Sequence, residues 1–154
     1  MKRLLSLSVI AVTVTGGFLS AQEKPSFAGT WKLSADASPD MFTSPQLTVS
    51  EEGKTMIVTS ATQMGDFKTT YSLDGTEAKS PIEFNGNTLD RVTKTAWDGG
   101  KLLLTVTSNF NGQSFETKSV WSLGADGALL VEVTRPDFQG GGGPVTTKAT
   151  YKKN

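Results

Sequence analysis

The chain of 154 residues contains no cysteine and no histidine, and its 15 lysine and arginine residues balance 15 aspartate and glutamate residues. The absence of both residue types excludes a Ser-His-Asp triad, a cysteine nucleophile, a disulfide and an ordinary zinc site. Zero net charge argues against DNA or another polyphosphate as a partner. The sequence therefore predicts no metal, no cofactor, no nucleic-acid partner and no enzymatic activity, and its length predicts a single domain.

Only the N-terminus carries a long apolar run. Lys2 and Arg3 precede an uncharged, mostly apolar stretch that reaches Leu19 and ends on small residues up to Ala21. This layout is typical of a secretory signal peptide, and the apolar stretch is shorter than the roughly 20 residues of a membrane span. We expect cleavage after Ala21, which divides the chain into a signal peptide (1–21) and one secreted or periplasmic domain (22–154). An uncleaved membrane anchor is the alternative.

The rest of the chain alternates between apolar and polar residues with period two, which indicates half-buried strands, and no run of ten residues has helical spacing. Glycine next to asparagine or aspartate separates the runs, as tight hairpin turns require. The short links predict antiparallel neighbours. The predicted strands are 27–34, 46–51, 54–62, 66–73, 76–84, 88–97, 101–109, 113–123, 128–135 and 145–152.

A meander of about ten strands has two exposed edges unless it closes on itself. We therefore predict an all-β fold, an up-and-down antiparallel β-barrel of about 8–10 strands, with a two-sheet sandwich as the alternative. The outward faces of the predicted strands are charged, which argues against a wall that faces lipid. We expect a monomer with no stable membrane insertion. The outward charges are Lys68, Lys94, Glu116, Lys118 and Lys148.

Two segments carry a resemblance to known proteins. The domain opens at 27–33 with Phe-Ala-Gly-Thr-Trp-Lys-Leu and ends at 147–153 with Thr-Lys-Ala-Thr-Tyr-Lys-Lys. A Gly-x-Trp on the first strand and this last strand resemble the lipocalins and the intracellular fatty-acid-binding proteins, together called calycins. The opening also resembles that of small secreted bacterial proteins. The resemblance implies a lipocalin-like barrel with a cavity for a lipid or another small apolar molecule.

The resemblance also implies an Arg-x-Tyr pair on the last strand that holds a fatty-acid carboxylate. In this chain Ala149 stands at the arginine position and only Tyr151 remains, while Trp121 stands at a second interior arginine of the family. Without these cations a buried carboxylate is left unpaired, which is strongly unfavourable. We therefore expect an apolar or amphipathic ligand rather than a fatty acid.

The candidate ligand-binding residues share the inward parity of the apolar positions, and small residues in mid-strand leave space for a ligand. The alternatives are that threonine methyl groups fill a narrower barrel, that the aromatic residues are core, and that Arg91 reaches solvent at a strand end. The candidates are Tyr71, Arg91, Thr93, Thr95, Trp97, Thr117, Trp121 and Tyr151, with Thr69, Ser119 and Thr147 as further small inward residues.

Three residues are candidates for closing the bottom of the barrel. Gly29 and Trp31 form the Gly-x-Trp motif, and the resemblance implies that Trp31 packs under a cationic side chain at that end. Arg135 is the candidate for this cation–π contact.

Together these features predict a secreted, non-catalytic barrel that binds a small apolar or amphipathic ligand. The first alternative is a structural or protein-interaction module of the cell envelope whose barrel is filled, and the second is an enzyme that works through carboxylates or tyrosine. The ligand-binding and structural hypotheses predict different centres of the barrel, because no space for a ligand is left if the large inward residues converge. Those residues are Met56, Tyr71, Trp97, Trp121 and Tyr151.

Overall fold

The computed structural model describes residues 23–35, 40, 42–138 and 140–154, so the predicted signal peptide lies outside the described residues. Within these ranges, no helix is long and apolar enough to cross a membrane. The regular elements are eleven strands: β1 (Gly29–Leu33), β2 (Gln46–Glu52), β3 (Thr55–Thr62), β4 (Gly65–Ser72), β5 (Ala78–Lys79), β6 (Ile82–Phe84), β7 (Asn87–Asp98), β8 (Lys101–Phe110), β9 (Gln113–Leu123), β10 (Leu129–Arg135) and β11 (Val145–Lys153).

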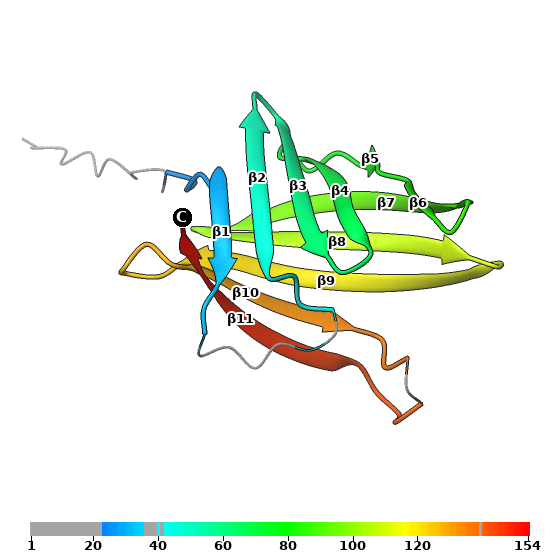
Figure 1. Cartoon of the computed structure of the whole chain (residues 1–154). Coiled ribbons are helices and arrows are strands. Elements are labelled where there is room, and N and C mark those ends of the chain that lie inside the picture. Colours follow the sequence, from blue (N-terminus) through cyan, green and yellow to red (C-terminus); the bar gives the residue numbers. More distant parts are fainter. Residues whose placement is uncertain (1–22, 36–39, 41, 139) are drawn as a thin grey trace, which may run out of the picture.

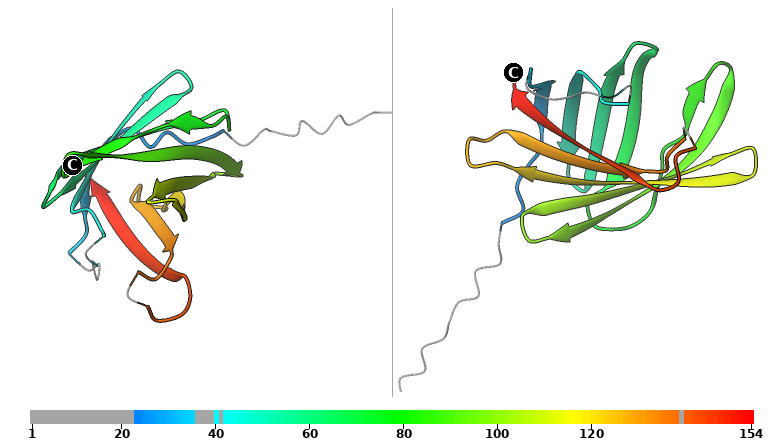
Figure 2. Two further views of the ribbon diagram at one scale, coloured as in Figure 1. Left: turned by 90° about the vertical axis from the view of Figure 1, so that its right-hand side faces the viewer. Right: turned by 90° about the horizontal axis from the view of Figure 1, so that it is seen from below.

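The strands form one sheet in the order β4-β3-β2-β1-β11-β10-β9-β8-β7-β5, and β6 also pairs with β7. Neighbouring strands are antiparallel throughout, which confirms the predicted all-β, up-and-down barrel rather than the two-sheet sandwich. In Figure 1, β1 to β4 run nearly vertically, whereas β7 to β9 cross them nearly horizontally and β10 and β11 cross them obliquely. The two views of Figure 2 show the strands curving around a common interior.

The tight turns form where the sequence supplies residues that tolerate a positive φ. Asn111 and Gly112 have φ angles of 49° and 76° and join β8 to β9, and Asn85 and Gly86 join β6 to β7 with 50° and 76°. Two consecutive positive φ angles are the mark of a type I′ turn, whose twist matches that of the flanking strands. These turns therefore set the register of both hairpins, as the sequence predicted.

The predicted strand 76–84 is wrong in detail, because the structure splits it into β5 and β6 on either side of Pro81. Proline lacks the N–H that a continuous ladder needs. The predicted hairpin at Asp74-Gly75 is also absent, since β5 pairs with β7 and β4 is left at the end of the strand order. The barrel is therefore nearly closed, with one seam between β4 and β7.

Side chains of β7 cross this seam in place of a backbone ladder. The Thr93 hydroxyl donates to the Thr70 carbonyl and the Thr95 hydroxyl to the Ser72 carbonyl, both at 2.6 Å. On the same face of β7, Nη2 of Arg91 donates to the Lys68 carbonyl at 3.1 Å. At the far end of the row, the Trp97 indole N–H lies 3.4 Å from the Leu73 carbonyl oxygen. Alternate residues of β7 thus satisfy carbonyls of β4 and of Leu73, the residue that follows it, which would otherwise lack donors.

Ser80 strengthens the seam from the segment between β5 and β6. Its hydroxyl accepts the Thr70 backbone N–H at 3.0 Å, and its carbonyl accepts Nε of Arg91 at 3.0 Å. Its own N–H donates to the Arg91 carbonyl at 2.9 Å. One serine therefore links both sides of the seam.

Aromatic residues fill the end of the barrel nearest the N-terminal segment. The Phe27 carbonyl accepts the Trp31 indole N–H at 2.8 Å, and both residues are buried. The Phe27 ring centroid lies 6.2 Å from that of Trp97 and 5.8 Å from that of Trp121. Such stacked and edge-on pairs add to the free energy of burial. This end of the barrel is closed by packing.

The structure corrects the predicted cation over Trp31. Lys153 lies there, with Nζ 5.4 Å from the ring centroid, whereas Arg135 lies over Phe42. The reason is register: β1 pairs with β11 so that Trp31 faces Lys153, whereas Arg135 pairs with Val145 at the opposite end of β11. Gly29 allows the Lys153 contact, because a Cβ there would lie only 2.6 Å from Cε of Lys153.

The seam yields a first prediction. Replacing Thr93, which is fully buried, by valine keeps the branched shape but leaves the Thr70 carbonyl without its donor. We expect the free energy of unfolding to fall by about 1–3 kcal/mol, measured by urea denaturation. Thr105→Val, on the outer face of β8, is the control and should change it by less than about 0.5 kcal/mol. Equal losses in both variants would contradict the role of the seam.

Candidate functional site

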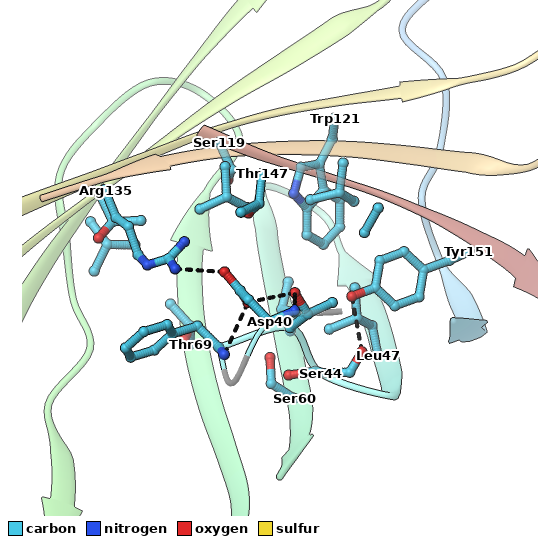
Figure 3. Close-up of a pocket in the computed structure, with 18 of the residues that line it drawn as sticks. Asp40, Ser44, Leu47, Ser60, Thr69, Ser119, Trp121, Arg135, Thr147 and Tyr151 are labelled. Atoms are coloured by element: carbon cyan, nitrogen blue, oxygen red, sulfur yellow. Dashed lines mark hydrogen bonds and ion pairs between the residues drawn. The ribbon is translucent and has the colours of Figure 1, made fainter. Parts of the chain in front are cut away.

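The barrel contains a cavity of about 170 Å³ beside the aromatic end, and this cavity is open to solvent on one side. Figure 3 shows its lining, to which β2, β3, β4, β8, β9, β10, β11 and the segment between β1 and β2 contribute. The apolar lining residues are Phe42, Leu47, Val58, Val106, Trp121, Val131, Val133 and Ala149, and the polar ones are Asp40, Thr43, Ser44, Ser60, Thr69, Tyr71, Thr117, Ser119, Arg135, Thr147 and Tyr151.

Small side chains keep this part of the interior open. Ser119, Val133 and Thr147 stand side by side across β9, β10 and β11, and their register directs all three to the same face of the sheet. In the next inward row, Trp121 is followed by Val131 and Ala149. No residue in the first row is large enough to reach the opposite wall. The cavity therefore follows from residue size at register-matched positions.

Several hydroxyl groups of the wall have no hydrogen-bond partner among the described residues. These oxygens are nevertheless accessible, because no enclosed side-chain nitrogen or oxygen in the described ranges is left without a partner. A polar group on an otherwise apolar wall can be satisfied by a ligand or by water. The hydroxyl groups belong to Ser60, Tyr71, Thr117, Ser119 and Thr147.

An ion pair between Arg135 and Asp40 lies at the mouth of the cavity (Figure 3). The Asp40 carboxylate also accepts the Thr43 hydroxyl at 2.7 Å and the Phe42 backbone N–H at 3.0 Å. The Arg135 guanidinium stacks 4.4 Å from the centroid of the Phe42 ring. These contacts join the end of β10 to the segment before β2, so they give the mouth a defined shape.

The environment of Asp40 lowers its pKa. Burial alone acts to raise that pKa, but the hydrogen bonds from Thr43, Arg135 and the Phe42 N–H, together with the positive charge of Arg135, outweigh it. The carboxylate is therefore ionised at neutral pH, and its charge offsets that of Arg135.

Burial raises the pKa of both tyrosines in the wall to about 12. For Tyr71 the nearby charge of Arg91 opposes this shift, whereas for Tyr151 the negative charge of Asp40 adds to it. The Tyr151 hydroxyl donates to the Ser44 carbonyl at 2.9 Å. Both phenols are therefore neutral over the physiological range and present hydroxyl groups rather than charges.

The structure separates the predicted site residues into two groups. Tyr71, Thr117, Trp121 and Tyr151 line the cavity, together with Thr69, Ser119 and Thr147. The residues of β7 hold the seam instead, and they are Arg91, Thr93, Thr95 and Trp97. A role in ligand binding remains a prediction for the residues that line the cavity.

The five large inward residues do not all converge. Tyr71, Trp121 and Tyr151 surround the cavity, whereas Met56 and Trp97 are absent from its lining. The interior is thus divided into a packed end and an open end.

Asp40, Ser44 and Ser60 line the cavity but were missed as site residues. Asp40 and Ser44 lie in the Pro-containing link before β2, whose length is unusual among tight turns. That length was the one available signal, since long connections in compact domains often carry function. The pairing of Asp40 with Arg135, 95 residues away, had no sequence signal.

The fold and the site together define an antiparallel, nearly closed β-barrel with a small internal cavity, an architecture compatible with the calycins. No known protein family matches the chain, and no curated protein is found to be similar to it. In the part of the chain that the structure describes, no three acidic residues are grouped so that they could hold a metal ion.

The raised tyrosine pKa values give a second prediction. The chain has only two tyrosines, so phenolate absorbance at 295 nm reports on Tyr71 and Tyr151 alone. We expect a midpoint near pH 12 in the folded protein and near pH 10 in urea. Because the folded-state pKa values are raised, the resulting stability is complete below about pH 10 and is lost above it. A native midpoint near pH 10 would place both rings in water.

The ion pair gives a third prediction. Asp40→Asn leaves Arg135, whose side chain is only 12% exposed, without its charge partner, and should lower the free energy of unfolding by about 1–2 kcal/mol at pH 7. The pKa of Asp40 is lowered on folding. Its contribution is therefore complete above the unfolded value of about 3.9 and is lost as pH falls below it. Urea denaturation at pH 7 and pH 3 should show the wild type and the variant converging at acid pH.

Proposed function

We propose that this protein is an exported binding protein, without catalytic activity, whose barrel holds one small, uncharged, amphipathic molecule. The observation that carries the proposal is the cavity of about 170 Å³ beside a packed aromatic end. Cavities in well-packed proteins are few and lower stability, so one of this size in a barrel interior favours a binding role.

The volume limits the ligand to one ring or a short chain. An apolar cavity of about 150 Å³ holds benzene, whereas sites for drug-sized ligands occupy about 300–1,000 Å³. We therefore expect a molecule of up to about ten non-hydrogen atoms. A long-chain lipid would not fit without rearrangement of the wall.

The lining supports a ligand with an apolar body and one or two polar groups. Trp121 and the valines at 58, 106, 131 and 133 offer apolar surface, while the hydroxyls of Ser60, Tyr71 and Ser119 can exchange hydrogen bonds. A few placed polar groups on an apolar wall are the usual composition of a small-molecule site.

The charges of the site favour a neutral ligand. Arg135 is the cation in the lining, and Asp40 already neutralises it at the mouth. Trp121 and Ala149 both line the cavity, and the resemblance to fatty-acid-binding proteins implies that they stand where that family carries arginines. A buried carboxylate would therefore lack a partner, which is costly in a wall of low polarity.

A variant that fills the cavity tests the proposal. Ala149→Leu adds a branched side chain to the wall, whereas Thr150→Leu adds a similar one to the next residue, which faces outward. We would titrate both variants and the wild type with 4-ethylphenol, 1-hexanol and dodecanoate, using tryptophan fluorescence and calorimetry. Wild type and Thr150→Leu should bind at least one of the two neutral probes, and Ala149→Leu should bind about tenfold or more weakly.

Native mass spectrometry of protein purified from its own host provides a second readout. A bound species of low mass in wild type and Thr150→Leu that is missing from Ala149→Leu would support the proposal. Bare protein in every case, together with no saturable response to either neutral probe, would overturn it in favour of a structural or protein-interaction module. Preferential binding of dodecanoate would contradict the neutral-ligand assignment.

A further inference from the structure

Exposed apolar side chains gather at one end of the barrel. Consecutive antiparallel strands place alternate connections at alternate ends, so five connections lie at the mouth end: those after β1, β3, β6, β8 and β10 (Figures 1 and 2). A large apolar residue lies in or directly beside each of them, between 41% and 70% exposed. We call these five residues the apolar tips: Phe42, Met64, Phe84, Phe110 and Phe138.

The opposite end differs. Of the large apolar residues that are exposed in the described ranges, only Leu123 borders a connection there, and it is 36% exposed. Leu103 and Leu130 lie within strands on the outer wall. Single exposed apolar residues are ordinary, but one at every connection of a single end is not.

We propose that the apolar tips dock the mouth end of the barrel reversibly onto an electrically neutral lipid bilayer. The tips belong to separate connections, and the one ring contact between two of them joins Phe42 and Phe138 at 6.3 Å, while Phe138 also packs edge-on against Phe115 of β9 at 5.4 Å. A protein partner needs a contiguous surface of about 800 Å² per side. A bilayer interface instead accepts side chains one at a time, and aromatic residues favour its headgroup region. The separation of the tips thus favours lipid over protein.

The charges next to the tips select the kind of bilayer. Within two residues of the five tips the sequence has four carboxylates and no lysine or arginine, and Arg135, which stacks on Phe42, is already neutralised by Asp40. Anionic membranes attract clusters of basic residues, which are missing here. Docking therefore depends on apolar contact and requires a zwitterionic surface such as phosphatidylcholine. The four carboxylates are Asp40, Asp66, Glu83 and Asp137.

Vesicle flotation tests the docking with matched variants. The triple variant Met64→Ser, Phe84→Ser, Phe110→Ser removes three tips, and Leu103→Ser, Leu123→Ser, Leu130→Ser removes three exposed leucines elsewhere. We expect the wild type and the leucine variant to float with phosphatidylcholine vesicles. The tip variant should partition at least about tenfold more weakly, since each buried apolar side chain contributes about that factor. Addition of phosphatidylglycerol should not strengthen binding. No flotation of the wild type, or equal losses in both variants, would overturn the proposal.

Site-specific labelling keeps the test independent of any effect of three substitutions on folding. Because the chain has no cysteine, Phe110→Cys and Ala125→Cys each provide a single thiol for an environment-sensitive nitrobenzoxadiazole dye. Position 110 lies at the mouth end and position 125 in the connection after β9, at the opposite end. With phosphatidylcholine vesicles, only the dye at position 110 should brighten and shift to the blue. An equal response at both positions, or none at 110, would contradict docking through the tips, whatever the cavity binds.

Discussion

The barrel depends on how four carbonyl groups, three of β4 and that of Leu73 directly after it, find donors at the seam. An open sheet would leave the edge of β4 to water or to another chain. Here Arg91, Thr93, Thr95 and Trp97, which alternate along β7, send side chains across to that edge. The closure is made by rotatable side chains instead of a rigid ladder, yet it satisfies the backbone groups that burial would otherwise leave unpaired. The two threonines are therefore committed to the wall, which is why they do not line the cavity.

Closure of the seam allows the interior to be divided. At one end Phe27, Trp31 and their aromatic neighbours pack closely, and this end contributes hydrophobic free energy. At the other end small residues leave a cavity, which costs stability in proportion to its volume. The free energy gained by burial at the packed end can offset this loss of stability, because both ends belong to one sheet and fold together. The mouth is then shaped by the Asp40–Arg135 pair, so space, shape and polarity of the site come from different parts of the chain.

Much of the fold could be predicted from local pattern, because strands and tight turns depend on neighbouring residues. Alternation located most strands, and Asn-Gly pairs located turns that the structure contains. Parity also assigned Tyr71, Trp121 and Tyr151 to the inside. Parity does not say which strands meet, so Thr93 and Thr95 could not be separated from Thr117. For the same reason the sequence predicted Arg135 over Trp31, where the structure has Lys153. The pairing of Asp40 with Arg135 could not be predicted either. These contacts depend on register between distant strands.

The pairing of β1 with β11 has a consequence for the order of folding. Trp31 lies opposite Lys153, so the first strand of the barrel borders the last one in the middle of the sheet. The loop that this contact closes spans nearly the whole domain. Contacts so distant in sequence form slowly, because the entropy lost on closing the loop is not compensated until the contact has formed. Hairpins between β2 and β10 close short loops and can form independently of β1, but β1 cannot gain its second neighbour until β11 is in place. Completion of the barrel is therefore a late step of folding, because it requires β11 whatever the order in which the hairpins form.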